Sequence, residues 1–188
     1  MKLRDGLLFV ATIILSACVT HIRPDRTYNP PPKEALSHFQ HFELAPLQAS
    51  PEASQEGSAL ARIDANVRQR VQPLVAQWNS SGTGGRALRI EPYVSQLKFV
   101  GVNGRFWAGP LAGSSAVVMK MRLVDVATGK TVAEPEFFQR ASAMGGTFAV
   151  GGTDYGMLAR IATVAEQYLK RNYPAAVGGP TGLDGTEE

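Results

Sequence analysis

Hydrophobic and polar residues alternate along four stretches of the chain, and a period of two residues is typical of strands that bury one face. These stretches span residues 37–47, 88–100, 115–126 and 131–142. The third is the clearest, because Val117, Met119, Met121 and Leu123 occupy every second position. The first has mixed faces and is closed by Pro46, which predicts a strand at the edge of a sheet.

The segment from Asp125 to Lys130 predicts a tight turn between the third and fourth strands. The Asp125 carboxylate can accept hydrogen bonds from backbone amides two or three residues later, and Gly129 can adopt the left-handed conformation. Pro92 and Pro135 interrupt the second and fourth strands. Because proline has no amide hydrogen to donate, they predict bulges or edge positions there.

Apolar residues recur at steps of three and four over residues 58–79 and 154–172, which predicts two helices. The first stripe consists of Leu60, Ile63, Val67, Val71, Leu74, Val75 and Trp78, and the second of Tyr155, Leu158, Ile161, Ala165, Tyr168 and Leu169. Pro73 lies inside the first helix and is expected to bend it. The order β-α-β-β-β-α predicts an α+β fold with a mainly antiparallel sheet and two helices packed on one face.

The first residues have the pattern of a bacterial signal peptide. Lys2 and Arg4 precede an apolar run over residues 7–15, which is much shorter than the roughly 20 residues that a spanning helix needs. The sequence Leu-Ser-Ala-Cys at residues 15–18 matches the lipobox of bacterial lipoproteins, which implies cleavage before Cys18 and its acylation. The alternative is an ordinary signal peptide followed by a free cysteine, although a lone thiol is unusual in a secreted chain.

The position after the cysteine bears on the destination. Val19 stands where an aspartate would hold an enterobacterial lipoprotein at the inner membrane. By that analogy we expect the protein to be lipid-anchored to the outer membrane on its periplasmic side. The membrane, reached through acylated Cys18, is then its first partner.

Composition divides the rest of the chain. Residues 1–17 are the signal peptide, and residues 18–36 are polar and contain Asn29-Pro30-Pro31-Pro32, so we expect an extended tether. Residues 37–173 are expected to form a single periplasmic α+β domain. Residues 174–188 lack a core-forming pattern, which predicts a disordered tail. The mature chain carries 17 basic and 15 acidic side chains without a dense basic run, which makes nucleic acid a poor partner.

Two glycine-rich segments are candidates for function. Residues 101–114 carry Arg105, Phe106 and Trp107 among four glycines, so this loop is either a lid over the core or a docking tip for a partner. Residues 145–153 contain Gly-Gly-Thr twice, with the spacing of a phosphate loop but with Gly152 in the lysine position. A flexible connector is therefore favoured there over a weak anion site.

Known catalytic patterns are missing from the sequence. It contains no nucleophile elbow and no metal signature, and its one cysteine is assigned to the lipid. His38 and His41 point to opposite faces of a strand and are expected to be exposed rather than metal ligands. Glu134 and Glu136 flank a proline and are expected to be solvated. We therefore expect no catalytic residues, no metal and no cofactor.

Several of these features occur together in a known order. They are Val100-Gly101, the glycine-rich Phe-Trp loop, a strand ending Arg122-Leu123-Val124-Asp125, the turn Thr128-Gly129-Lys130, the double Gly-Gly segment and the last helix. In this the chain resembles a family of bacterial lipoproteins classed under a domain of unknown function, the DUF4410 type. Phe106 and Trp107 depart from the smoother glycine run of that family. The resemblance implies a periplasmic lipoprotein and brings no catalytic residues.

The sequence as a whole favours a binding or accessory module of the bacterial envelope over an enzyme. Its further partner would be an envelope protein or other copies of the chain. The alternative is a carrier of a small or lipidic ligand, which requires an internal cavity, for which Met119, Met121 and Trp107 are the candidate lining.

Overall fold

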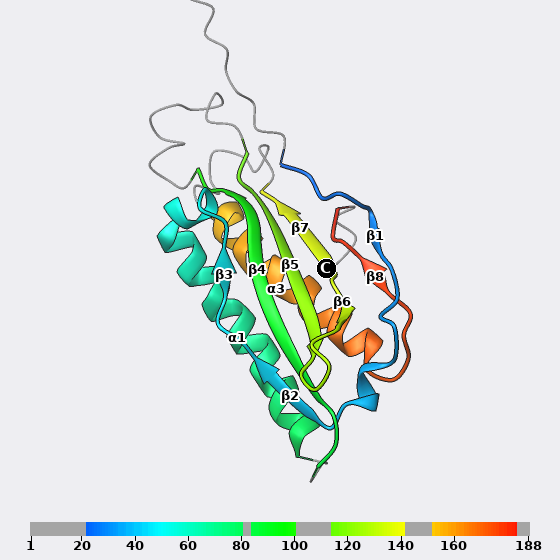
Figure 1. Cartoon of the computed structure of the whole chain (residues 1–188). Coiled ribbons are helices and arrows are strands. Elements are labelled where there is room, and N and C mark those ends of the chain that lie inside the picture. Colours follow the sequence, from blue (N-terminus) through cyan, green and yellow to red (C-terminus); the bar gives the residue numbers. More distant parts are fainter. Residues whose placement is uncertain (1–21, 81–83, 101–113, 142–151, 184–188) are drawn as a thin grey trace, which may run out of the picture.

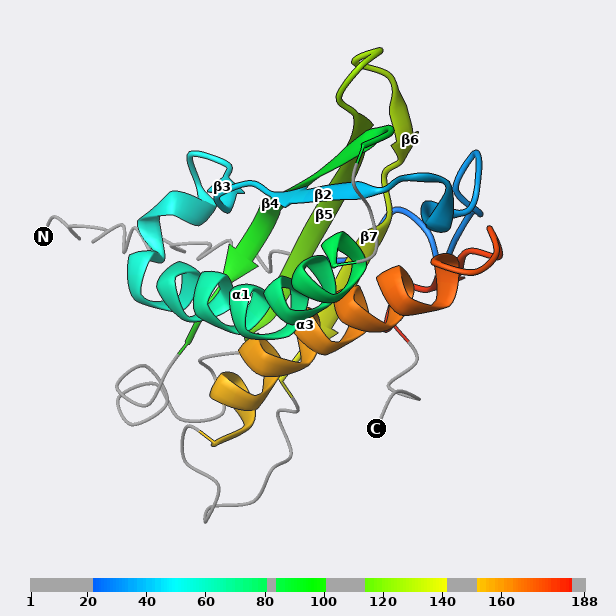
Figure 2. The ribbon, with the colours of Figure 1, turned by 90° about the horizontal axis from the view of Figure 1, so that it is seen from below.

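The computed structural model describes residues 22–80, 84–100, 114–141 and 152–183. The main sheet contains β2 (His41–Leu44), β3 (Gln48–Ala49), β4 (Ala87–Lys98), β5 (Ala116–Asp125), β6 (Thr131–Ala133) and β7 (Glu136–Arg140). Two long helices, α1 (Gly57–Asn79) and α3 (Gly152–Asn172), pack against it (Figure 1). Figure 2 shows both helices on the same side of the sheet. The predicted α+β fold with two helices on one face is confirmed.

The strand order explains which pairs are parallel. β4 lies between β5 and the short β2 and β3, while β6 and β7 both pair with β5. β2 and β3 run parallel to β4, because α1 carries the chain back along the sheet before β4 begins. All pairings of β5 are antiparallel, and the turn after β5 accounts for those with β6 and β7. The first predicted strand thus lies at an edge, as expected, but pairs in parallel.

The hydrophobic core lies between the sheet and the two helices. From the sheet it receives every second residue of β4 and β5, including Ile90, Val94, Met119 and Met121, which are fully buried. Figure 1 views the sheet from the side opposite the two helices, and we call this side the open face. Near the end of α1, Trp78 stacks on Tyr173, with 4.5 Å between the ring centroids. The three- and four-residue periodicity predicted most of the buried stripe of each helix, but Tyr155, the first residue of the second predicted stripe, is 41% exposed.

The predicted irregularities and the hairpin are also confirmed. The register of β4 and β5 shifts between Val94 and Gln96, soon after Pro92, and Pro135 separates β6 from β7. In the hairpin, the Asp125 carboxylate accepts a hydrogen bond from the Ala127 amide at 2.9 Å. Gly129 has a φ of 66°, the left-handed conformation that the sequence predicted.

The predicted tether and tail are wrong for the parts that the structure describes. Strand β1 (Tyr28–Asn29) pairs antiparallel with β8 (Gly179–Pro180), so a segment of the predicted tether and one of the predicted tail form a small sheet of their own. This sheet lies along the free edge of β7, where the Phe138 amide donates to the Thr181 carbonyl oxygen at 2.7 Å. Proline-rich geometry is extended, but it does not keep a segment in solvent when long-range hydrogen bonds fix it.

Asn29 is the residue that attaches the N-terminal segment to β7. It is fully buried, its amide nitrogen donates to the Glu136 carbonyl oxygen, and its side-chain oxygen accepts from the Glu136 amide, both at 2.8 Å. Asn79 does the same at the opposite edge of the sheet, where its side chain bonds both the amide and the carbonyl of Phe42. One asparagine side chain therefore satisfies the backbone of each edge strand at one residue, in place of another strand.

Two short 3₁₀ helices complete the fold, at Leu36–His38 and Ala53–Gln55. Leu36, which the sequence placed at the end of the tether, is fully buried in the core. Among the described residues, no helix is both long enough and apolar enough to cross a membrane.

Candidate functional site

The candidate site residues predicted from the sequence lie outside the described residues. This applies to Cys18 and to Arg105, Phe106 and Trp107, as well as to the phosphate-loop-like segment as far as residue 151. Whether the Phe106-Trp107 loop is a lid or a docking tip therefore stays a prediction. The described residues on either side of this loop meet, since the Val100 amide donates to the Ser115 hydroxyl at 2.9 Å.

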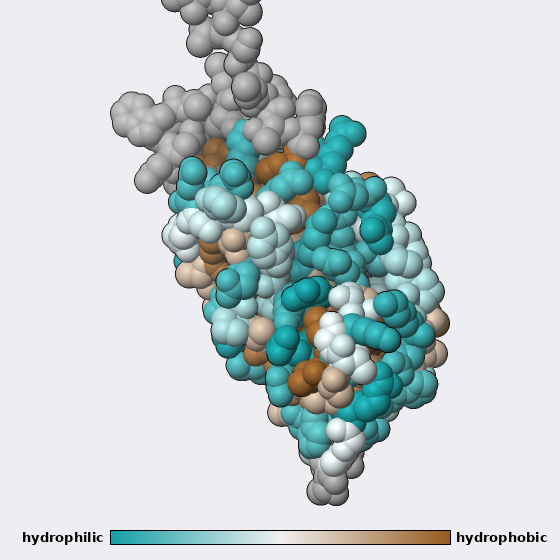
Figure 3. Space-filling view, viewed as in Figure 1, coloured by the Kyte–Doolittle hydropathy of each residue, from teal (hydrophilic) through white to brown (hydrophobic). Residues whose placement is uncertain are grey.

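The open face carries a row of charged side chains in the middle of the sheet. Glu91 on β4 accepts a hydrogen bond from Arg89 Nε at 2.7 Å and lies 2.6 Å from Arg122 Nη2 on β5. The two arginines hold the pKa of the Glu91 carboxyl below its usual range, the bond from Arg89 having the largest effect. Glu91 is thus a fixed anion between two cations. Figure 3, which views this face, shows it mostly hydrophilic with small hydrophobic patches.

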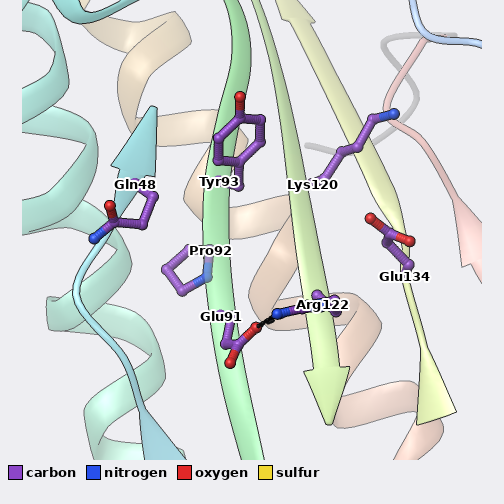
Figure 4. A pocket seen from close by; sticks show the side chains of 7 residues that line it. All are labelled: Gln48, Glu91, Pro92, Tyr93, Lys120, Arg122 and Glu134. Atoms are coloured by element: carbon purple, nitrogen blue, oxygen red, sulfur yellow. Dashed lines mark hydrogen bonds and ion pairs between the residues drawn. The ribbon is translucent and has the colours of Figure 1, made fainter. Parts of the chain in front are cut away.

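A shallow hollow of about 300 Å³ lies beside this row. Its lining comes from three strands and the β6–β7 connection, namely Gln48, Glu91, Pro92, Tyr93, Lys120, Arg122 and Glu134 (Figure 4). Tyr93 is 39% exposed, because it points to the face of the sheet that the helices do not cover. Lys120 lies 3.6 Å from Asp25 and 3.7 Å from Glu136, so its ammonium is held only loosely. The hollow thus offers one aromatic ring surrounded by charges of both signs.

The expectation of two solvated glutamates is half right. Glu134 is exposed, but Glu136 is only 4% exposed because the N-terminal segment covers it. One of its carboxylate oxygens accepts a hydrogen bond from the Asp25 amide at 2.7 Å. The covering segment had been assigned to a tether, so the burial of Glu136 could not be predicted.

A second charged cluster fixes the far end of the molecule. The Arg86 guanidinium bonds both carboxylate oxygens of Glu34 at 2.8 Å and Asp125 at 2.7 Å, and it lies 4.3 Å above the Phe39 ring. Hydrogen bonds from Arg86 are the largest cause of the lowered pKa of both carboxyls. Because Glu34 belongs to the N-terminal segment, this cluster attaches that segment to the hairpin end of the sheet.

The two histidines that the structure describes, His38 and His41, have structural partners. His38 Nδ1 lies 3.2 Å from a Glu34 oxygen, and His41 Nε2 accepts a hydrogen bond from the Gly84 amide at 3.2 Å. Among the described residues, no group of three or more acidic, histidine or cysteine side chains could hold a metal ion. Met119 and Met121, considered above as the lining of a carrier cavity, are both fully buried in the main core.

Comparison with known proteins gives a distant likeness of fold. No family model matches the chain, and no curated protein sequence matches it. A PelC dodecamer from Paraburkholderia phytofirmans matches with 16% identity and a TM-score of 0.37, over 72% of this chain and 91% of that one. A candidate lipoprotein from Caulobacter crescentus matches with 10% identity and a TM-score of 0.38, over 74% of this chain and 89% of that one.

A protein from Xanthomonas campestris, classed in a family of unknown function, matches with 13% identity and a TM-score of 0.40, over 71% of this chain and 87% of that one. All three TM-scores lie below 0.5. The function of this chain therefore has to be argued from its own residues.

Proposed function

We propose that the protein is a lipid-anchored module of the bacterial envelope, attached to the periplasmic side of the outer membrane by acylated Cys18, and that it acts by binding and not by catalysis. The observation that carries the proposal is the Leu-Ser-Ala-Cys sequence after a short apolar run. Only residues 19–21 separate this cysteine from Ile22, which is 3% exposed and belongs to the folded part of the chain. The lipid would therefore be joined almost directly to the domain.

The anchoring part of the proposal is tested by removing the thiol. Cys18→Ser should abolish acylation and move the protein from the detergent-rich to the aqueous phase in a detergent phase separation. Thr20→Ser, a change of one methyl group two residues later, is the matched control and should leave partitioning unchanged. A Cys18→Ser protein that still enters the detergent phase would show that something other than a lipid on this residue attaches the chain.

The binding part of the proposal assigns the partner contact to the charged row on the open face. Tyrosine and arginine are enriched in protein interfaces, and Tyr93 lies opposite Lys120, in the cross-strand position next to the Glu91–Arg122 pair. Charges of both signs suit a protein partner with a complementary arrangement better than they suit a nucleic acid or an anionic polymer. We therefore assign this surface to another protein of the envelope.

A photoreactive phenylalanine analogue in place of Tyr93 tests this contact in living cells. The expected result is one crosslinked product of defined mass, which is absent when the same analogue replaces Tyr28, an even more exposed residue at 52%. A product of twice the mass of the chain would make the partner a second copy. Equal products from both positions, or none from position 93, would contradict the assignment.

A further inference from the structure

One end of the molecule carries a group of arginines without acidic partners. Arg23 and Arg140 are both exposed, and neither forms an ion pair with any of the described residues. Arg160 lies beside Arg140 and bonds only neutral groups, the Gln139 side chain at 3.0 Å and the Arg140 carbonyl at 3.3 Å. This contrasts with the far end, where Arg86 binds two carboxylates.

The same end has a hollow between two of these arginines. A space of about 430 Å³ is lined by Arg23, Pro24, Phe138, Arg140 and Leu183. Leu183 is 37% exposed, so one wall of the hollow is an apolar side chain in contact with solvent. Beneath it, Ile22, Ala116, Val118 and Phe138 form a small hydrophobic cluster on the open face. Two cationic groups around an apolar floor are complementary to an anionic amphiphile.

Chain length places this end of the molecule next to the lipid anchor. Cys18 is four residues before Ile22, and four extended residues span at most about 14 Å. The other end of the sheet is much farther away, because the 10 residues of β5 extend roughly 33 Å from Ala116 to the hairpin. In Figure 1 the described chain begins beside the same ends of β5 and β7 from which Ala116 and Arg140 come. A lipid on Cys18 therefore brings Arg23 and Arg140, and not the hairpin end, to the membrane surface.

We propose that Arg23, Arg140 and the hollow between them form a docking surface for anionic phospholipid headgroups, which orients the domain with its hairpin end away from the membrane. The proposal rests on attachment through Cys18 and adds the lipid class and the orientation. Each arginine near an anionic membrane surface raises the affinity of the protein for that membrane several-fold. This attraction fades beyond about 8 Å at physiological salt. The short link keeps both arginines within reach of that surface.

The test couples the chain of residues 18–188 through the Cys18 thiol, the only thiol in the sequence, to maleimide-bearing lipid in vesicles. This coupling does not depend on natural acylation, so its result is separate from that of the Cys18→Ser experiment. Amide hydrogen exchange is then compared in vesicles of phosphatidylcholine alone and with about one third phosphatidylglycerol. We expect peptides covering residues 22–27 and 138–141 to exchange at least about threefold more slowly when phosphatidylglycerol is present.

The matched variants separate a specific surface from general charge attraction. Arg23→Gln/Arg140→Gln should lose the slowing, whereas Lys130→Gln/Arg171→Gln removes the same charge from exposed positions at the other end and should keep it. High salt should also remove it, because the Debye length falls to about 3 Å at 1 M. Equal exchange in the two lipids, loss of the slowing in the control variant, or slowing that persists at high salt would overturn the proposal.

Discussion

The two faces of the sheet are built from the same strands but are stabilised differently. On the helix-covered face, Ile90, Met119, Met121 and Leu123 belong to one continuous apolar core. On the open face, Glu91, Lys120 and Arg122 form ion pairs in the middle of the sheet, and Ile22 covers Val118 and Phe138 at one end. Burial of apolar area contributes far more free energy than exposed ion pairs do. One face therefore determines stability, which leaves the charged row of the other free to serve recognition.

Leu123 and Arg122 are neighbours on β5 that point to opposite faces, and they give the most direct test of this difference. Leu123 is fully buried, and Leu123→Ala should lower the free energy of unfolding by about 2–5 kcal/mol. Arg122→Ala should lower the free energy of unfolding by less than about 1 kcal/mol, because the Arg122 side chain is 53% exposed. Urea denaturation of both variants measures the difference. Equal costs would mean that the open face is part of the core.

The segment that covers part of the open face depends on Asn29. Asn29→Ala leaves the amide and carbonyl of Glu136 without their partner in a buried place, which should cost about 1–3 kcal/mol. Asn79→Ala breaks the matching pair of bonds to Phe42 at the other edge. Asn79 is only half-buried, so water can replace its side chain and the cost should be smaller. A larger cost at Asn79 in thermal or urea denaturation would contradict this ranking.

What could be predicted from the sequence follows the same division. The helix-covered face was predictable, because periods of two and of three to four residues record directly which residues are buried. The role of Asn29 was not predictable, because its partner Glu136 is 107 residues away and nothing local distinguishes a buried asparagine from one in a turn. The pairing of β1 with β8 could not be predicted either, because strands of two residues are too short to show a periodicity.

The charged sites were partly predictable. Asp125 was correctly assigned to the hairpin turn, since its bond to the Ala127 amide is local. Its ion pair with Arg86 joins residues that are 39 apart, and the bonds of Arg86 to Glu34 join residues 52 apart. Alternation placed Lys120 and Arg122 on the face opposite the core, but it could not show that Glu91 lies between two arginines. Such contacts depend on strand register, which the sequence alone did not specify.

The Arg86 cluster should make the attachment of the N-terminal segment sensitive to acid. The pKa values of Glu34 and Asp125 are lowered in the folded protein, so both carboxylates favour folding above their unfolded pKa values of about 4. This contribution is lost as the pH falls through the lower pKa values of the folded state. Arg86→Met should therefore melt below the unchanged protein at pH 7, with a gap that narrows below about pH 4.

Arg171→Met is the control for this measurement, because Arg171 is exposed and has no ion pair among the described residues. Its melting temperature should follow that of the unchanged protein at every pH. Thermal melts between pH 7 and about pH 2.5 measure the gap for both variants. A gap for Arg86→Met that is as wide in acid as at pH 7 would mean that packing on Phe39, and not the carboxylates, explains the role of Arg86.

The smallest effect is expected for the charged row itself. Glu91→Gln removes the anion between Arg89 and Arg122, whose side chains are 41% and 53% exposed, so the cost should stay below about 1 kcal/mol. The free-energy cost of Glu91→Gln should still exceed that of Arg122→Gln. Glu91→Gln leaves Arg89 and Arg122 facing a neutral group, whereas Arg122→Gln leaves the Arg89–Glu91 pair intact. The cost of Glu91→Gln should shrink in 1 M salt, where exposed charges are screened beyond about 3 Å. Urea denaturation at low and high salt measures this. A loss comparable to that of Leu123→Ala, or one that salt does not change, would make the row a structural element and remove the reason for assigning it to recognition.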